Sequence, residues 1–195
     1  QSMVNRNTGR KLKGSETKEL GEREIKRMFS DKHLVMSAQS NCNVMDFLDG
    51  QIDAIEKAVI KEVKLLYPFE KLLTVPGIGN ILGMTIMLES GDMNRFQEVS
   101  NYSSYCRCVS SKKVSNGKKK GENNKKNGNK YLAWAYVEAA NFMRRFCPQA
   151  RSWHQRKVSK TNQIVATKAL SNKIARACYF IIKDQTDFDP EMLFK

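Results

Sequence analysis

The sequence lacks any long apolar run, because no stretch approaches the roughly 18 residues that a membrane-spanning helix needs. Its first residues contain no basic segment followed by an apolar one, so they do not resemble a secretory signal. We therefore expect no membrane partner and a cytoplasmic location. Segments that alternate apolar and polar residues are also nearly absent, which disfavours a sheet and predicts an all-α fold.

Metal-ligating residues are scarce, with two His and five Cys in 195 residues. An odd number of cysteines scattered over apolar helical patterns argues against a disulfide framework and suits a reducing compartment. Cys106 and Cys108 lie too close in sequence for an ordinary structural zinc pair, and only His33 and His154 could complete such a site. We expect this chain alone to bind no metal or cofactor.

Acidic residues are too few to balance the basic ones, since 20 Asp and Glu face 34 Lys and Arg and leave a formal charge of +14. A basic surface of this strength concentrates polyanions and binds them through release of their counterions. Nucleic acid, and DNA first, is therefore the expected partner.

The basic residues are densest between Arg107 and Lys130, where nine Lys or Arg accompany one acid, Glu122. Few apolar groups are available there to offset the entropy of ordering the chain, so we predict a long basic loop. Ser115, followed by Asn116, is either a turn residue in that loop or a nucleophile that meets a phosphate. The residues expected to contact nucleic acid here are Lys112, Lys113, Lys118, Lys119, Lys120, Lys125, Lys126, Asn129 and Lys130.

A second candidate contact is a turn between two apolar helical segments within residues 72–89. It is typical of a helix-hairpin-helix, in which glycines let the backbone approach a phosphate and the next helix directs its free N–H groups at that anion. A Pro-Gly turn that only connects two helices is the alternative. The residues expected to contact DNA backbone are Pro76, Gly77, Ile78, Gly79 and Asn80. Glu89 and Asp92, just beyond, are interpreted as helix caps or partners of a nearby Arg rather than metal ligands.

Apolar residues recur at intervals of three and four from Val44 to Leu66, which predicts one helix with a continuous apolar stripe. The stripe suits either a coiled-coil arm that makes a homo-oligomer or a core helix of its own domain. We divide the chain into a linker and helical arm, residues 1–70, and a C-terminal helical domain, residues 71–195. Further helices are predicted over Tyr131–Phe146 and after a cap at Thr161 or Asn162, and the acidic tail is expected to pack through Phe188, Leu193 or Phe194.

The order of these pieces resembles the C-terminal half of bacterial insertion-sequence transposases of the IS-one-ten (IS110) family, which are related to Piv-type DNA invertases. Many relatives carry a Gly-Leu pair shortly after the residue equivalent to Tyr105, where this chain has Arg107 and Cys108. The segments that carry the resemblance are Thr74–Gly79, Glu89–Phe96, Tyr102–Tyr105, Ser115–Lys118, Lys126–Leu132 and Lys168–Ile182.

The resemblance implies a recombinase with an N-terminal RuvC-like domain, whose four acids hold Mg²⁺, a coiled-coil insert and a C-terminal domain with a catalytic serine. Ser115 matches that serine by position, and Ser110 and Ser111 are the neighbouring alternatives. Family members use a structured bridge RNA to choose their DNA, so the resemblance adds a guide RNA as partner and a nucleoid-associated bacterial location.

These observations together predict a transposase C-terminal region that binds DNA and supplies a serine for strand cleavage and exchange. The chain begins with Gln rather than Met, so we expect further sequence upstream. Without the acids of a RuvC-like domain we expect this chain to be inactive alone. The alternative is a helix-hairpin-helix remnant that retains only DNA binding.

Overall fold

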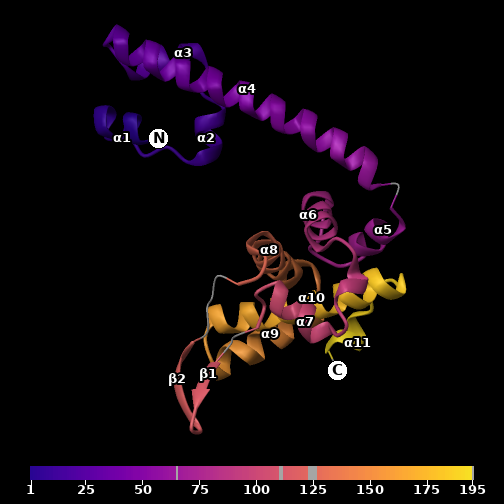
Figure 1. The fold of residues 1–195 in the computed structure, drawn as a ribbon. Coiled ribbons are helices and arrows are strands. Elements are labelled where there is room, and N and C mark those ends of the chain that lie inside the picture. The colour runs from indigo at the N-terminus through magenta and orange to yellow at the C-terminus, as the bar shows by residue number, and fades with distance from the viewer. Residues whose placement is uncertain (65, 110–111, 123–126, 195) are drawn as a thin grey trace. The chain divides into compact units, whose positions relative to one another are not determined.

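The computed structural model describes residues 1–64, 66–109, 112–122 and 127–194. By their internal contacts these residues form two compact units, Gln1–Ala58 and Val59–Lys195. Helices account for nearly all regular structure in the described chain, which confirms the all-α class, and one two-stranded hairpin is the exception (Figure 1). No described helix is both long and apolar enough to cross a bilayer.

The first unit packs three short helices on the start of a long one. These are α1 (Ser2–Thr8), α2 (Gly14–Lys18), α3 (Glu22–Met28) and most of α4 (Lys32–Val63). Asp31 caps the start of α4, because its Oδ1 accepts hydrogen bonds from the N–H groups of His33 at 2.6 Å and Leu34 at 3.3 Å. The core of this unit consists of Val4, Leu12, Ile25, Phe29 and Ala38.

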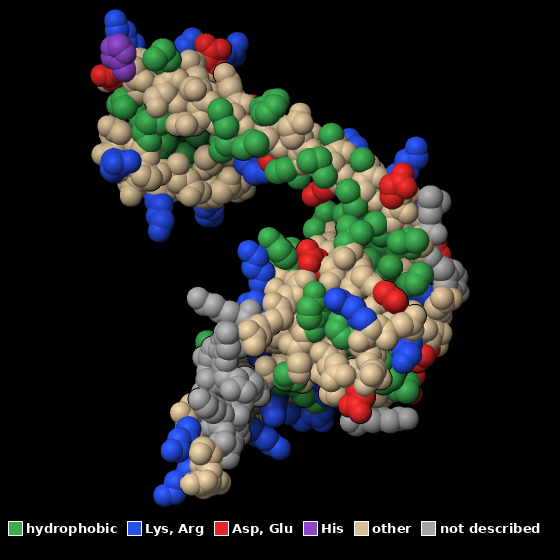
Figure 2. All heavy atoms as spheres, in the orientation of Figure 1, with side chains coloured by type: hydrophobic (Ala, Val, Ile, Leu, Met, Phe, Trp, Pro, Cys, Tyr) green, Lys and Arg blue, Asp and Glu red, His purple; other side chains and the backbone are tan. Residues whose placement is uncertain are grey.

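The apolar stripe of α4 does not have one environment along its length. Near its start Ala38 is buried in the first unit, and at its end Val63 packs with Phe69 and Met84 in the second unit. Between these ends five apolar side chains are at least half exposed: Val44, Phe47, Leu48, Ile52 and Ile55 (Figure 2). The two interpretations of the stripe therefore apply to different parts of it, with core contacts at the ends and a bare apolar face in the middle.

The second unit is built around α10, which contacts α5, α7, α8, α9 and the 3₁₀ helix η1. Asn162 caps α10, as predicted, by accepting from the N–H of Val165 at 2.9 Å. The elements of this unit are α5 (Tyr67–Leu73), α6 (Asn80–Ser90), η1 (Met93–Arg95), α7 (Val99–Tyr105), β1 (Lys112–Ser115), β2 (Lys118–Glu122), α8 (Lys130–Phe146), α9 (Pro148–Lys160), α10 (Gln163–Asp184) and α11 (Pro190–Phe194).

Three buried hydroxyl groups cross the core of the second unit. The Tyr102 hydroxyl lies 2.7 Å from Ser90 Oγ and 2.6 Å from the Tyr136 hydroxyl, so α6, α7 and α8 are joined by one chain of hydrogen bonds. Burial raises the pKa of both Tyr102 and Tyr136, which keeps these groups protonated. A fully paired buried network of this kind specifies one packing of the helices.

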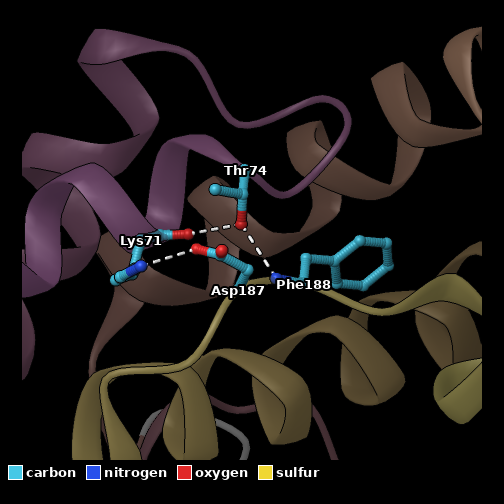
Figure 3. A network of polar contacts seen from close by, with 4 residues as sticks. All are labelled: Lys71, Thr74, Asp187 and Phe188. Atoms are coloured by element: carbon cyan, nitrogen blue, oxygen red, sulfur yellow. Dashed lines mark hydrogen bonds and ion pairs between the residues drawn. The ribbon is translucent and has the colours of Figure 1, made fainter.

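The acidic tail is fastened to the second unit, as the sequence predicts. Figure 3 shows Lys71 of α5 paired with Asp187 at 2.8 Å and the Thr74 hydroxyl accepting from the N–H of Phe188 at 2.9 Å. Phe188 and Phe194 also pack against the main core, and the Phe194 ring contacts that of Trp153. The tail thus braces the turn that follows α5.

Gly77 lets that turn lie directly on α8. Its φ is +95°, and a Cβ added there would lie 2.6 Å from the backbone N of Met143 and 2.8 Å from the carbonyl O of Ala139. Any other residue would both strain the backbone and force α8 away. Gly79 differs, because its φ is −99° and a Cβ there would meet no atom within 4 Å.

The contrast between these two glycines predicts opposite outcomes for one substitution. Gly77→Ser should lower the free energy of unfolding by about 2 kcal/mol or more, the combined cost of overpacking and of positive φ. Gly79→Ser should leave stability unchanged or raise it slightly, because serine is a favourable N-cap for α6. Urea unfolding of both variants followed by circular dichroism measures this, and equal losses would contradict the role given to Gly77.

Candidate nucleic-acid interface

The predicted basic loop is wrong for residues 112–122, which form an antiparallel β-hairpin instead. Ser115 pairs with Lys118, and Asn116 and Gly117 make the two-residue turn with φ of 51° and 70°. Two positive φ values are what a type I′ hairpin turn requires, and Asn-Gly is its preferred sequence. The local turn chemistry therefore overrides the low apolar content on which the loop prediction depended.

The hairpin projects away from the helices of the second unit (Figure 1) and carries cations to its end (Figure 2). Ser115 is exposed next to the turn, and Lys118 and Lys120 are exposed on the paired strand. Lys112, Lys113 and Lys119 lie on the two strands. Ser110, Ser111, Lys125 and Lys126 lie outside the described residues. The fold thus brings Ser115 together with Lys118, opposite it in the strand register.

The chain enters the hairpin segment through a tight end of α7. The N–H of Arg107 donates to Ser104 O and the N–H of Cys108 to Ser103 O, both at 3.0 Å, which is the bonding pattern of a Schellman motif. Arg107 takes the left-handed conformation with φ 53°, a position that glycine fits best. The guanidinium of Arg107 offsets the cost of this backbone conformation, because its Nε and Nη2 donate to the carbonyl O of Gly128 at 3.0 and 2.7 Å.

The chain leaves the hairpin segment beside the point where it entered. The N–H of Asn129 donates to Tyr105 O at 2.7 Å, and a Cβ on Gly128 would collide with that carbonyl. Asn129 Oδ1 caps α8 by accepting from the N–H groups of Tyr131 at 2.8 Å and Leu132 at 3.1 Å. Entry and exit are therefore held together, and we call Glu89, Tyr105, Arg107, Gly128 and Asn129 the clamp.

Glu89 closes the clamp from α6. Its carboxylate accepts a 2.6 Å hydrogen bond from Asn129 Nδ2, so its partner is an Asn rather than the Arg expected from the sequence. Arg95 lies over the Tyr105 ring at 4.5 Å, and hydrogen bonds from Arg95 and Asn129 lower the pKa of the Tyr105 hydroxyl. Asp92 is a cap, as predicted, because its side chain accepts from the N–H of Asn94.

The residues of the predicted helix-hairpin-helix divide into buried and exposed ones. Ile78 belongs to the core, and Gly77 is partly buried against the backbone of α8. Gly79 and Asn80 are exposed at the start of α6, and no side chain caps that helix. Its first N–H groups are consequently the part of this segment suited to an anion. Pro76 is half-buried beside them.

Metal ligands do not gather in the described part of the chain, where no three His, Cys, Asp or Glu side chains could hold one ion. The residues present therefore do not fit Mg²⁺, and no catalytic step is assigned to a metal on this chain. The residues that the sequence did not single out are Arg107 and the contact between Tyr105 and Gly128. The clearest signal for them is Gly128-Asn129 before an apolar helix, a cap sequence inside the segment predicted to be a loop.

Comparison with known proteins finds sequence similarity to transposases. Residues 69–155, which run from α5 into α9, match the model of the family described as Transposase IS116/IS110/IS902. A Pseudomonas aeruginosa (strain PAO1) protein described as a probable family 20 transposase is 26% identical over 147 residues, 73% of this chain and 44% of that protein. The chain thus spans less than half of that relative. Both matches are to transposases, and the family match agrees with the resemblance predicted from the motifs.

The clamp predicts a graded response to changes at Asn129. Asn129→Ala removes the α8 cap and the bond to Glu89, and should lower the free energy of unfolding by about 1 to 2 kcal/mol. Asn129→Ser keeps an oxygen that can cap α8 but loses the amide donor, so it should recover about half of that loss. Denaturant unfolding of the three proteins tests this, and equal losses in both variants would show that the cap is not what Asn129 contributes.

Proposed function

We propose that this chain is the DNA-binding C-terminal part of an IS110-family transposase, and that Ser115 is the nucleophile that cleaves and exchanges DNA strands. The observation that carries the proposal is the position of Ser115, exposed beside the turn of a projecting basic hairpin with Lys118 opposite it. An exposed serine among cations can meet the phosphate of a duplex, whereas a serine in the helical core could not.

The proposed chemistry is a transesterification. Ser115 Oγ attacks a DNA phosphorus, an Oγ–P bond forms, and the bond from that phosphorus to one sugar oxygen breaks. The serine gives up its proton, and the departing sugar oxygen takes one up. The phosphodiester energy is kept in the serine ester, so a second strand can be joined without ATP. Cations such as Lys118 and Lys120 would offset the charge of the phosphate that is attacked.

The remaining components of the reaction belong to the longer protein that this chain resembles. A RuvC-like domain would supply the Mg²⁺ site, since the described residues here hold no group suited to it. The start of α6, at Gly79 and Asn80, would hold DNA backbone without reading bases. A structured guide RNA would be a second polyanion for the same basic surface.

Self-association through α4 is also part of this proposal. Its middle exposes Val44, Phe47, Leu48, Ile52 and Ile55 on one face, and a contiguous apolar face of this kind is typical of an interface between helices. Two copies paired along this stripe would place two hairpins in one assembly, as exchange of two DNA ends requires.

The first prediction of this proposal concerns the covalent intermediate. In a protein that joins this chain to a RuvC-like domain, Ser115→Ala should abolish the covalent protein–DNA adduct seen on denaturing gels, because no other group provides the attacking oxygen. DNA affinity measured by fluorescence anisotropy should change by less than about twofold, since a hydroxyl contributes little to binding phosphate. Ser110→Ala and Ser111→Ala serve as controls and should retain the adduct. An adduct that survives Ser115→Ala would exclude this serine.

The second prediction concerns the oligomer. Leu48→Glu combined with Ile52→Glu should convert a dimer into a monomer in sedimentation equilibrium, because two carboxylates cannot be buried in an apolar interface. Both side chains are about half exposed in the single chain, so its fold should persist. Lys57→Glu changes the net charge by the same amount on the opposite side of the helix and should leave the dimer intact. A wild-type chain that stays monomeric at high concentration would contradict the interface.

A further inference from the structure

A second cationic surface is formed by the end of α8, by α9 and by α10. Residues 139–183 contain ten Lys and Arg and no Asp or Glu. None of the ion pairs found among the described residues involves these cations. Their charge is therefore not neutralised within the described part of the chain, and it can act on a polyanion.

Residues of these three helices line an open pocket. Its volume is about 400 Å³, within the range of sites that hold small ligands. All of the residues that line it except Val158 are polar or basic. The lining residues are Arg144, Arg151, His154, Gln155, Val158, Ser159 and Gln163.

Two arginines supply the charge of the pocket. Arg151 is held in place because its Nε and Nη2 donate to the carbonyl oxygens of Arg144 at 3.1 Å and Arg145 at 2.9 Å, at the end of α8. Arg144 donates through Nη2 to Asn141, but its buried Nε–H has no hydrogen-bond partner. The hydrogen bonds of the Arg144 guanidinium within the protein are therefore incomplete, and Arg144 is one of the residues that line the pocket.

His154 forms another part of the pocket lining, and its ring is held in place by Thr167. Thr167 donates its hydroxyl hydrogen to Gln163 O at 2.9 Å, so at 3.1 Å from His154 it can only accept, and His154 Nε2 carries the proton. Burial, with the Arg144 charge, lowers the pKa of His154. The His154 ring is therefore neutral and held in one orientation. The positive charge of the pocket comes from Arg144 and Arg151.

We propose that this pocket binds a phosphate group of a nucleic-acid backbone, which gives the protein an anchoring site separate from the hairpin and from the start of α6. The inference rests on the proposed function for the presence of nucleic acid. Arg144 and Arg151 provide the charge-assisted donors, and Gln163, the first residue of α10, adds an amide at the rim. A phosphate held here fixes the register of the strand without reading its sequence.

The test places one negative charge inside the pocket and the same charge beside it. Gln163→Glu puts a carboxylate among the lining residues, and Ile164→Glu puts one on the adjacent residue, which is 81% exposed and does not line the pocket. Both changes place an acid in the first turn of α10, where a helix tolerates it well, so thermal unfolding should confirm that both variants stay folded. The probes are a 20-base-pair DNA duplex and an RNA hairpin of equal length at fixed salt.

Gln163→Glu should weaken binding by about tenfold, because it replaces a phosphate contact with repulsion at short range. Ile164→Glu should weaken binding by less than about threefold, through long-range charge alone. If Gln163→Glu weakens binding of the DNA duplex alone, the pocket binds DNA. If it weakens binding of the RNA hairpin alone, the pocket binds RNA. Equal effects of the two variants on both probes would overturn the pocket while leaving the proposed function intact. Failure of the wild-type chain to bind either probe would instead overturn the proposed function.

Discussion

The clamp at the base of the hairpin is the constraint on which the candidate site depends. The segment from Arg107 to Lys130 has nine cations and almost no apolar groups, so it cannot be positioned by packing of its own side chains. Its position is set at its two ends, where Arg107 bonds to Gly128 O and Asn129 bonds to Tyr105 O. Arg107 keeps its left-handed backbone conformation because its N–H bonds to the end of α7 and its guanidinium bonds to Gly128 O. Ser115 consequently lies in a segment whose two ends, at Arg107 and Asn129, are held by α6, α7 and α8.

The helices behind the clamp are arranged to keep it in place. Hydroxyl groups of Ser90, Tyr102 and Tyr136 connect the same three helices through the core, so the clamp and the core network share one framework. Gly77 brings the preceding turn onto α8 at backbone distance, and the tail braces that turn through Thr74. The start of α6 and the base of the hairpin are thus positioned by one set of contacts.

Much of this fold could be predicted from the sequence because its helices carry strong local signals. The Asn162 cap, the boundary at Cys147 and the packed aromatic residues of the tail were all predicted and are confirmed. The hairpin was not predicted because the loop prediction depended on the low apolar content of the segment, whereas the type I′ turn at Asn116-Gly117 decides its structure. The change of environment along α4 could not be predicted, because periodicity identifies an apolar face but not what covers it.

The candidate site was predicted only in part, for a related reason. Glu89, Tyr105 and Asn129 lie up to 40 residues apart in sequence, and nothing in their spacing indicates that one amide joins α6 to the cap of α8. The left-handed conformation of Arg107 could not be predicted either, because glycine is the residue that usually indicates such a position. The geometry of the site is set by single hydrogen bonds between residues far apart in sequence. The helices could be predicted because apolar residues recur along them.

The central claim is that the hydroxyl of Ser115 becomes joined to DNA, and peptide mapping of the trapped adduct tests it most directly. A protein that joins this chain to a RuvC-like domain would be incubated with DNA ends, denatured, digested with nuclease and protease, and analysed by fragmentation mass spectrometry. The account predicts a nucleotide remnant on Ser115. A remnant on Ser110, on Ser111 or on a residue outside the hairpin would contradict it.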